Sequence, residues 1–366
     1  MSEWKIYRKH ADKPHNDIVA KGRLPEPPIW RDFQALKTRK LRGSNYKPSD
    51  REVEMVNTAL LLRRPLLITG NPGSGKSSLA YAVAWQLNLG SVLWWPINSR
   101  STLQDGLYTY DALGRLRDLN IEKIESERRA RSGTIDAEQR QLSASEQIGR
   151  YVRLGPLGTA LYGGSRPRVL LIDEIDKSDI DLPNDLLHVL EEGAFNIPEL
   201  QRLTPEDAGQ ASEDADRTIT VGVYPHDENV RSKMIPVTDG RVECNRFPFV
   251  VLTSNGEREL PPAFRRRCLS LDIEDPEGDR LRDIVAAHVE EARTSGASTE
   301  VDRSVELLAE VEEVLKEFER KRENDSVLLA TDQLLNAVYL ITRDRAPTGE
   351  ERKQILRTVL RELGRK

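Results

Sequence analysis

The sequence predicts an α/β protein in which helices cover a parallel sheet, followed by a smaller domain made of helices alone. An apolar run at 66–69 is followed by a helical pattern and a second apolar run at 92–97, which is the order of a βαβ unit. Two later apolar runs, 168–174 and 247–255, end in polar residues, at the sheet edge where ligands bind in open α/β folds. After Pro276 the apolar residues recur only at helical spacing.

A glycine-rich loop follows the first strand. From Gly70 to Ser77 it has the spacing Gly-x-x-x-x-Gly-Lys-Ser, the phosphate-binding P-loop pattern. The glycines let backbone N–H groups converge on a phosphate, and the next helix adds its positive end. Lys76 is expected to reach the terminal phosphates, and the Ser77 hydroxyl to ligate Mg²⁺. A turn that binds nothing is the alternative, but the complete motif between a strand and a helix favours a nucleotide. The predicted nucleotide-binding residues are Gly70, Asn71, Pro72, Gly73, Ser74, Gly75, Lys76, Ser77 and Ser78.

Two adjacent carboxylates, Asp173 and Glu174, end the strand at 168–174. At the end of a buried strand, one carboxylate can hold Mg²⁺, directly or through water, while the next activates a water molecule. An ordinary acidic turn is the alternative. Because the two carboxylates follow a P-loop in the chain, the catalytic interpretation is favoured, and in it Asp173 is the metal ligand.

Composition restricts the class of protein. The 366 residues are enough for two or three domains, and 38% hydrophobic with 31% charged content describes a real core under a heavily charged surface. No apolar run approaches the ~20 residues that span a membrane, and the N-terminus lacks the apolar core of a signal peptide. The two cysteines, Cys244 and Cys268, lack metal-ligand spacing. We therefore expect a cytoplasmic protein. The net charge of −5, with both signs interspersed, argues against a dedicated nucleic-acid binder.

The domain organisation is read from shifts in composition. A basic, proline-rich arm with Trp4 and Trp30 either packs on its own subunit or grips a neighbour. The first of two insertions is charged, as solvated helical faces are. The second alternates in the manner of strands and predicts a β-hairpin that turns at Asp239-Gly240. The expected boundaries are 1–44 for the arm, 45–274 for the nucleotide-binding domain, about 98–166 and 194–245 for its insertions, and 275–366 for the helical domain.

The ordered motifs resemble those of the AAA+ ATPases, and most closely the MoxR-like branch. The resemblance extends from about Pro48 to Ile273 and is broken by the two insertions. Its supporting stretches are Leu66–Ser77, Leu154-Gly155-Pro156-Leu157, Ile172-Asp173-Glu174-Ile175-Asp176-Lys177, Thr253-Ser254-Asn255 and Leu260–Arg267.

This resemblance implies a five-stranded parallel sheet, a helical lid over the nucleotide, and assembly into a ring, commonly hexameric. It also implies that ATP hydrolysis remodels a partner protein, often one containing a von Willebrand factor A domain. By resemblance, Lys76 contacts the β- and γ-phosphates, and Ser77 with Asp173 holds Mg²⁺. Glu174 is the base and Asn255 the sensor that orients the attacking water. Arg266 or Arg267, with Arg267 favoured, is the finger that reaches the neighbour's site.

The lid departs from the family pattern. The family often places an arginine near the start of the third lid helix, but 330–335 contains none, and Arg343 and Arg345 lie downstream. Tyr108 and Tyr110 lie where ring remodellers carry an aromatic pore loop, although core packing explains them equally well.

Three functions remain open. An ATP-driven ring that remodels a partner leads. A slow ATP-dependent assembly switch or scaffold is favoured by the missing lid arginine and opposed by the intact catalytic residues. A DNA-associated motor is disfavoured by the acidic charge balance.

Overall fold

A computed structural model describes most of the chain, including every predicted residue of the nucleotide site. The N-terminal arm apart from residue 43, and the pair Arg343 and Arg345, lie outside the described residues. The described residues are 43, 46–132, 148–164, 166–202, 218–224, 234–294, 304–324, 329–342 and 347–360.

These residues form two compact units. The sheet unit comprises 51–69 and 87–271 and contains both β-sheets, whereas the P-loop unit contains 70–86 together with the residues from 272 onwards. The expected boundaries at 45–274 and 275–366 stay predictions.

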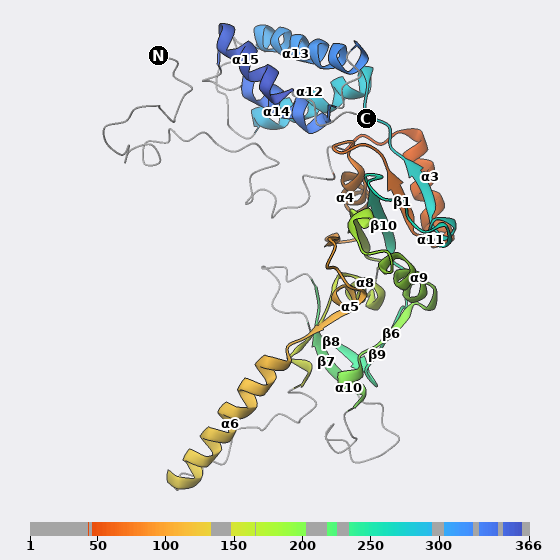
Figure 1. Ribbon diagram of the computed structural model, residues 1–366, viewed down its shortest axis with the longest axis vertical. Helices are drawn as coiled ribbons and strands as arrows, with labels where there is room; N and C mark the ends of the chain where they lie inside the picture. The colour runs from red at the N-terminus through yellow and green to blue at the C-terminus, as the bar shows by residue number, and fades with distance from the viewer. Residues whose placement is uncertain are drawn as a thin grey trace. The chain divides into compact units, whose positions relative to one another are not determined.

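The five-stranded parallel sheet that the resemblance implies is confirmed, in the order β11-β1-β10-β5-β2. Two of its neighbouring strands, β1 and β10, are labelled in Figure 1. All residues of β10 are buried, and β5 is buried up to its last residue, because helices cover both faces of such a sheet. Thr69 pairs with Ser254, and Leu252 with Ile172. The strands are β1 (Leu66–Thr69), β2 (Leu93–Pro96), β5 (Val169–Asp173), β10 (Phe249–Ser254) and β11 (Leu269–Asp272).

Short helices flank this sheet in the same unit. Among them, α8 packs against β2 and β5, and α11 packs against α9. Each of these three has a proline in its first turn, where the missing N–H costs nothing. Their bounds, with those of the remaining short helices, are α3 (Asp50–Leu62), α5 (Leu103–Leu107), α8 (Pro156–Tyr162), the 3-10 turn η3 (Ile175–Lys177), α9 (Leu182–Glu192), α10 (Pro198–Gln201) and α11 (Pro262–Arg267).

A second sheet contains strands from both insertions, although the sequence pattern gave no indication that the two insertions pair with each other. Its order is β3-β4-β7-β8-β9-β6. The expected hairpin is present, since Asp239-Gly240 connects β8 to β9 with positive φ at both residues. The first insertion also contributes β3 and β4, where only helical faces were expected, because strands of three residues show no readable period. The strands are β3 (Tyr108–Tyr110), β4 (Val152–Leu154), β6 (Ala194–Asn196), β7 (Thr218–Gly222), β8 (Met234–Thr238) and β9 (Arg241–Glu243).

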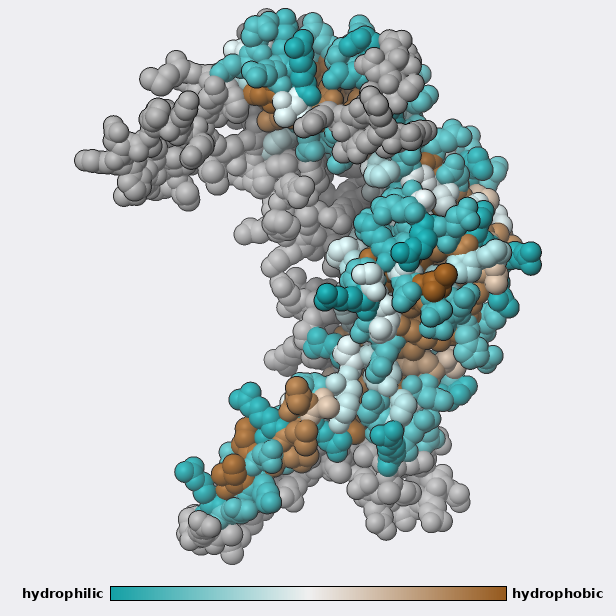
Figure 2. Space-filling view, viewed as in Figure 1, coloured by the Kyte–Doolittle hydropathy of each residue, from teal (hydrophilic) through white to brown (hydrophobic). Residues whose placement is uncertain are grey.

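Helix α6 (Ala112–Ser132) extends away from this second sheet (Figure 1). It carries apolar side chains that face solvent, visible as a brown row in Figure 2. Leu113 is 80% exposed, and Leu116 and Ile124 are each 58% exposed. Contiguous exposed apolar surface of this kind usually marks a site where a protein binds another molecule.

Tyr108 ties the two insertions together. Its side chain is buried, its hydroxyl donates to Glu199 at 2.9 Å, and its ring stacks on Phe195 with centroids 6.5 Å apart. This position is that of a core residue. Tyr110 is half-buried, and its hydroxyl accepts a hydrogen bond from Arg115 at 3.0 Å. Core packing and anchoring therefore account for both tyrosines.

We expect Tyr108→Phe to lower the free energy of unfolding by about 1–2 kcal/mol at pH 8, because it removes a buried hydrogen bond to a carboxylate. Burial and Glu199 raise the pKa of Tyr108 to about 12 from 10.0. Since the unfolded chain loses this proton first, stability should fall between pH 10 and 12, less steeply in the variant. Urea denaturation at pH 8 and across this range measures both. Tyr151→Phe is the matched control: its exposed bond to Asp118 should contribute less, and an equal loss would contradict the assignment.

Four helices form a separate core in the P-loop unit (Figure 1). Leu281, Phe318 and Leu334 are fully buried in it, as their helical spacing predicts. Thr348 is the residue before the last helix, and its side chain makes no capping hydrogen bond to that helix. No helix of the described residues is both long and apolar enough to cross a membrane. The helices of this unit are α4 (Lys76–Gln86), α12 (Gly278–Thr294), α13 (Ser304–Asn324), α14 (Thr331–Ile341) and α15 (Gly349–Val359).

Candidate functional site

The P-loop begins one residue after β1 and ends in α4. Lys76 is the first residue of that helix, and its ammonium group donates to the carbonyls of Gly70 and Asn71, each at 2.8 Å. The lysine is buried, with 7% of its surface exposed. Gly73 and Gly75 have φ of +79° and +94°, a region that side chains disfavour. The loop is therefore curled around its own lysine.

Helix α14 begins beside this loop. A Cβ at Gly73 would lie 2.8 Å from the Cβ of Ala330 and 3.2 Å from Oδ1 of Asp332. The residues next to the loop are thus small or acidic. The hydroxyls of Ser74 and Thr331 are buried and have no hydrogen-bond partner among the described residues. Buried polar atoms without partners are rare and call for a ligand or water.

A second link connects the P-loop to the lid through Asp275. Asn71 Nδ2 donates to Asp275 Oδ2 at 2.8 Å, and Arg322 of α13 pairs with the same oxygen at 2.7 Å. Both charged side chains are largely buried, at 13% and 19% exposure. This charge pair holds the first residues of the lid against the loop.

The paired carboxylates lie in the sheet unit, at the ends of β5 and β10. Thr253 Oγ1 donates to Asp173 Oδ1 at 2.7 Å and accepts from the backbone N–H of Glu174 at 2.9 Å. The Trp94 indole donates to the other Asp173 oxygen at 3.1 Å. One threonine thus contacts the side chain of the predicted metal ligand and the backbone of the predicted base, because strand β10 lies directly beside β5.

Glu174 has an unusual backbone conformation. Its φ of 61° and ψ of 50° place it in the left-handed region, which non-glycine residues rarely adopt outside turns and functional sites. Its carboxylate accepts from Asn255 Nδ2 at 3.3 Å on one oxygen and pairs with Lys177 Nζ at 2.9 Å on the other. The predicted base and sensor are therefore in contact. Lys177 is a neighbour that the motifs did not single out.

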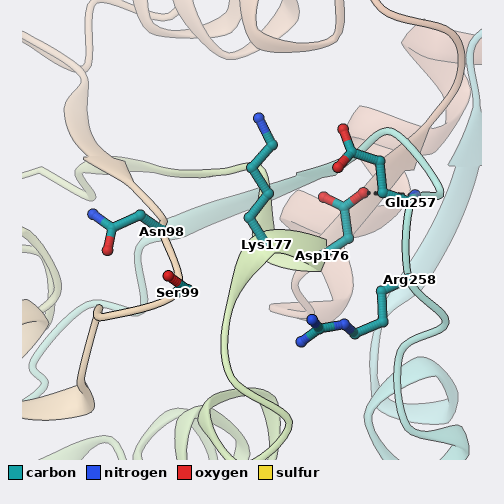
Figure 3. Close-up of a pocket in the computed structure, with 6 residues that line it drawn as sticks. All are labelled: Asn98, Ser99, Asp176, Lys177, Glu257 and Arg258. Atoms are coloured by element: carbon teal, nitrogen blue, oxygen red, sulfur yellow. Dashed lines mark hydrogen bonds between the residues drawn. The ribbon is translucent and has the colours of Figure 1, made fainter.

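A pocket of about 420 Å³ opens next to this cluster (Figure 3). Asp176 is 3% exposed there, and its Oδ2 accepts the backbone N–H groups of Asn255 and Glu257, each at 3.0 Å. This carboxylate therefore shapes the loop that carries the sensor. The pocket is lined by Asn98, Ser99, Asp176, Lys177, Glu257 and Arg258.

The arginine cluster lies on α11, whose C-terminal carbonyls accept from the Arg64 guanidinium. The distances from Arg64 are 2.5 Å to the Arg266 carbonyl and 3.1 Å to that of Arg267. The Arg267 side chain pairs with Glu191 of α9 at half exposure, whereas the exposed Arg266 side chain makes no hydrogen bond or ion pair within the described residues. Cations near a helix C-terminus are favoured, and Arg64 anchors this helix to the strand that leads into the P-loop.

The sequence motifs assign no role to several residues that position the predicted site residues. Thr253 and Lys177 belong to stretches that carry the resemblance, but no role was assigned to either of them or to Trp94. Thr253 and Trp94 reach Asp173 through strand pairing, whereas Lys177 reaches Glu174 through its spacing of three residues. Tyr46 is similar: its ring lies 3.2 Å from where a Cβ of Gly75 would be. The order of the motifs gave no signal for any of them.

The side chains present fit Mg²⁺ and a nucleoside triphosphate. Ser77 in the P-loop unit and Asp173 in the sheet unit each carry an oxygen donor of the kind that Mg²⁺ prefers. Within the described residues no group of three or more His, Cys, Asp or Glu could hold a metal alone. The orphan hydroxyls of Ser74 and Thr331 suit an oxyanion. When bound, Mg²⁺ supplies charge neutralisation for the phosphates.

Sheet order, P-loop and paired carboxylates together define a P-loop nucleotide-binding protein of the α/β class. The sequence matches the family described as AAA domain (dynein-related subfamily) over residues 65–268, more than half of its length. The chain therefore belongs to this AAA family. No curated protein matches it. A solved structure titled "Structure of C. elegans PCH-2" is similar at 14% identity, with 87% of this chain and 71% of that chain covered and a TM-score of 0.40.

Proposed function

We propose that the protein is an ATP-hydrolysing ring subunit that couples turnover to the remodelling or activation of a partner protein, as its resemblance to the MoxR-like branch implies. In this proposal the ring is a hexamer, and a von Willebrand factor A domain protein is a candidate partner. The observation that carries it is the contact between Glu174 and Asn255 beside Asp173.

The proposed division of labour follows from the chemistry of phosphoryl transfer, which depends on positioning and charge stabilisation. Lys76 binds the terminal phosphates, and Ser77 with Asp173 holds Mg²⁺. Glu174 takes the proton of the attacking water, which Asn255 orients. Arg267 or Arg266 of a neighbouring subunit stabilises the transferred phosphoryl group.

A slow ATP-dependent switch or scaffold is the second candidate. Two observations favour it: the lid presents Ala330 and Asp332 to the P-loop instead of an arginine, and Lys177 occupies one oxygen of Glu174. In that case the chain would assemble on ATP and turn it over slowly. Two features favour a protein partner over DNA: the row of exposed apolar side chains on α6 and the acidic charge balance of the chain.

We expect the wild-type chain to form a larger assembly with Mg²⁺ and ATP than without nucleotide, and to release phosphate from ATP. Light scattering after size-exclusion chromatography measures the assembly, and a coupled assay measures phosphate. Fast turnover supports the remodelling ring, while assembly with little turnover supports the switch. A strongly salt-sensitive shift of duplex DNA would instead support the DNA-associated motor. A chain that neither binds ATP nor assembles would contradict both leading proposals.

A further inference from the structure

The proposed base is held on both of its oxygens. Asn255 donates to Oε1 and Lys177 pairs with Oε2. A general base must accept a hydrogen bond from the water that it activates. Lys177 therefore competes with the attacking water for the carboxylate.

The same lysine has other acceptors within the pocket of Figure 3, where Lys177 lies between Asn98 and Ser99 on one side and Asp176 and Glu257 on the other. Only 3% of the Asp176 surface is exposed, and its Oδ1 has no hydrogen-bond partner among the described residues. Within the same residues the Glu257 carboxylate makes no hydrogen bond. A buried carboxylate oxygen without a donor is costly, so the pocket offers an ammonium group a second place to bind.

The electrostatics agree with this geometry. The hydrogen bond to Glu174 raises the pKa of Lys177 above its ordinary value, and the charges of Glu174, Glu257 and Asp176 add to that shift. All three carboxylates therefore attract one ammonium group. The Lys177–Glu174 pair is partly exposed, at 39% and 41%, and ion pairs of this kind are weak.

We propose that Lys177 is a positioning residue that restrains ATP hydrolysis: its ion pair with Glu174 holds the base in a resting state, and transfer of the ammonium group to Asp176 and Glu257 releases it. This inference rests on the proposed function, in which Glu174 is the base. The device is bistable because a single cation is shared between two sets of acceptors.

The test is a steady-state assay of Mg²⁺-dependent ATP turnover on the full chain. Lys177→Met removes the charge and keeps the length of the side chain, and it should raise kcat about two- to fivefold, with KM unchanged, because the competing pair is weak and half-exposed. Lys177→Arg should retain the restraint. Lys353→Met is the matched control, since Lys353 forms the same i,i+3 pair with Glu350 on α15 at 3.2 Å; it should leave kcat unchanged.

A double-mutant cycle tests the transfer to the pocket. Glu257→Gln removes one alternative acceptor and should lower kcat about two- to fivefold, whereas in the Lys177→Met background it should have no effect. If Lys177→Met is no faster than wild type while turnover still depends on Glu174, the restraint is overturned and the proposed function stands. If Glu174→Gln turns over ATP as fast as wild type, the proposed function itself fails. An equal effect of Glu257→Gln in both backgrounds would also overturn the transfer.

Discussion

ATP turnover by the Glu174→Gln variant is expected to fall by roughly 10²- to 10⁴-fold, the range that general-base catalysis contributes. Glutamine keeps the size of the side chain and its contact with Asn255, but an amide cannot take the proton of the attacking water. ATP binding should persist, because Lys76 and the P-loop are unchanged. Phosphate release measures the first effect, and titration with a fluorescent ATP analogue measures the second.

The matched control for this change is Glu350→Gln on α15. Glu350 also pairs with a lysine three positions away but belongs to no part of the proposed site, so its loss should leave turnover within the error of wild type. Assembly of Glu174→Gln on ATP should be at least as extensive as that of wild type, since bound ATP is no longer consumed. Turnover that survives the substitution would show that another residue is the base.

The second large effect concerns the arginines of α11. Arg267→Ala should lower turnover by roughly 10³- to 10⁵-fold, which is the contribution of an arginine finger, and Arg266→Ala should lower it much less. The ion pair between Arg267 and Glu191 is half-exposed and weak, so it does not prevent the guanidinium from turning to a phosphate. Phosphate release by the two single variants, assayed side by side, decides between them. The reverse order of effects would assign the finger to Arg266.

The central sheet could be predicted from the sequence because its three inner strands, β1, β10 and β5, are buried along almost their whole length, whereas the outer strands β2 and β11 alternate between buried and exposed residues. The runs at β5 and β10 are apolar without interruption, and the glycine spacing of the P-loop fixes the connection after β1. These signals are local in the chain. The observed contact between Glu174 and Asn255 has a related origin, since parallel strands bring their polar ends to one sheet edge.

The second sheet could not be predicted in the same way. Strands β3, β4 and β6 have three residues each, too few to establish a period of two, and their partners lie far away in the sequence. Tyr108 illustrates the difficulty. Its position favoured a pore loop as much as the core, and only its distant partner Glu199 shows which it is.

The proposed restraint of Glu174 by its ion pair with Lys177 could not be predicted from the sequence either. Lys177 follows the catalytic carboxylate by three residues, and a lysine at that spacing is ordinary on a solvated turn. Its competing acceptor Glu257 is 80 positions away in the chain (257 against 177). The pairing of β5 with β10 brings their following loops together. Chemistry that depends on such pairing becomes visible only in the folded chain.

The most direct test of a site completed by a neighbouring subunit mixes two inactive variants. Arg267→Ala subunits keep an intact P-loop, and Lys76→Ala subunits keep an intact arginine, so a mixed ring contains interfaces where both halves are present. We predict that phosphate release is near zero for each variant alone and recovers when the two variants are mixed. The recovery should be greatest when the two kinds of subunit are present in comparable amounts. No recovery at any ratio, with mixed assemblies verified by size, would contradict a shared site.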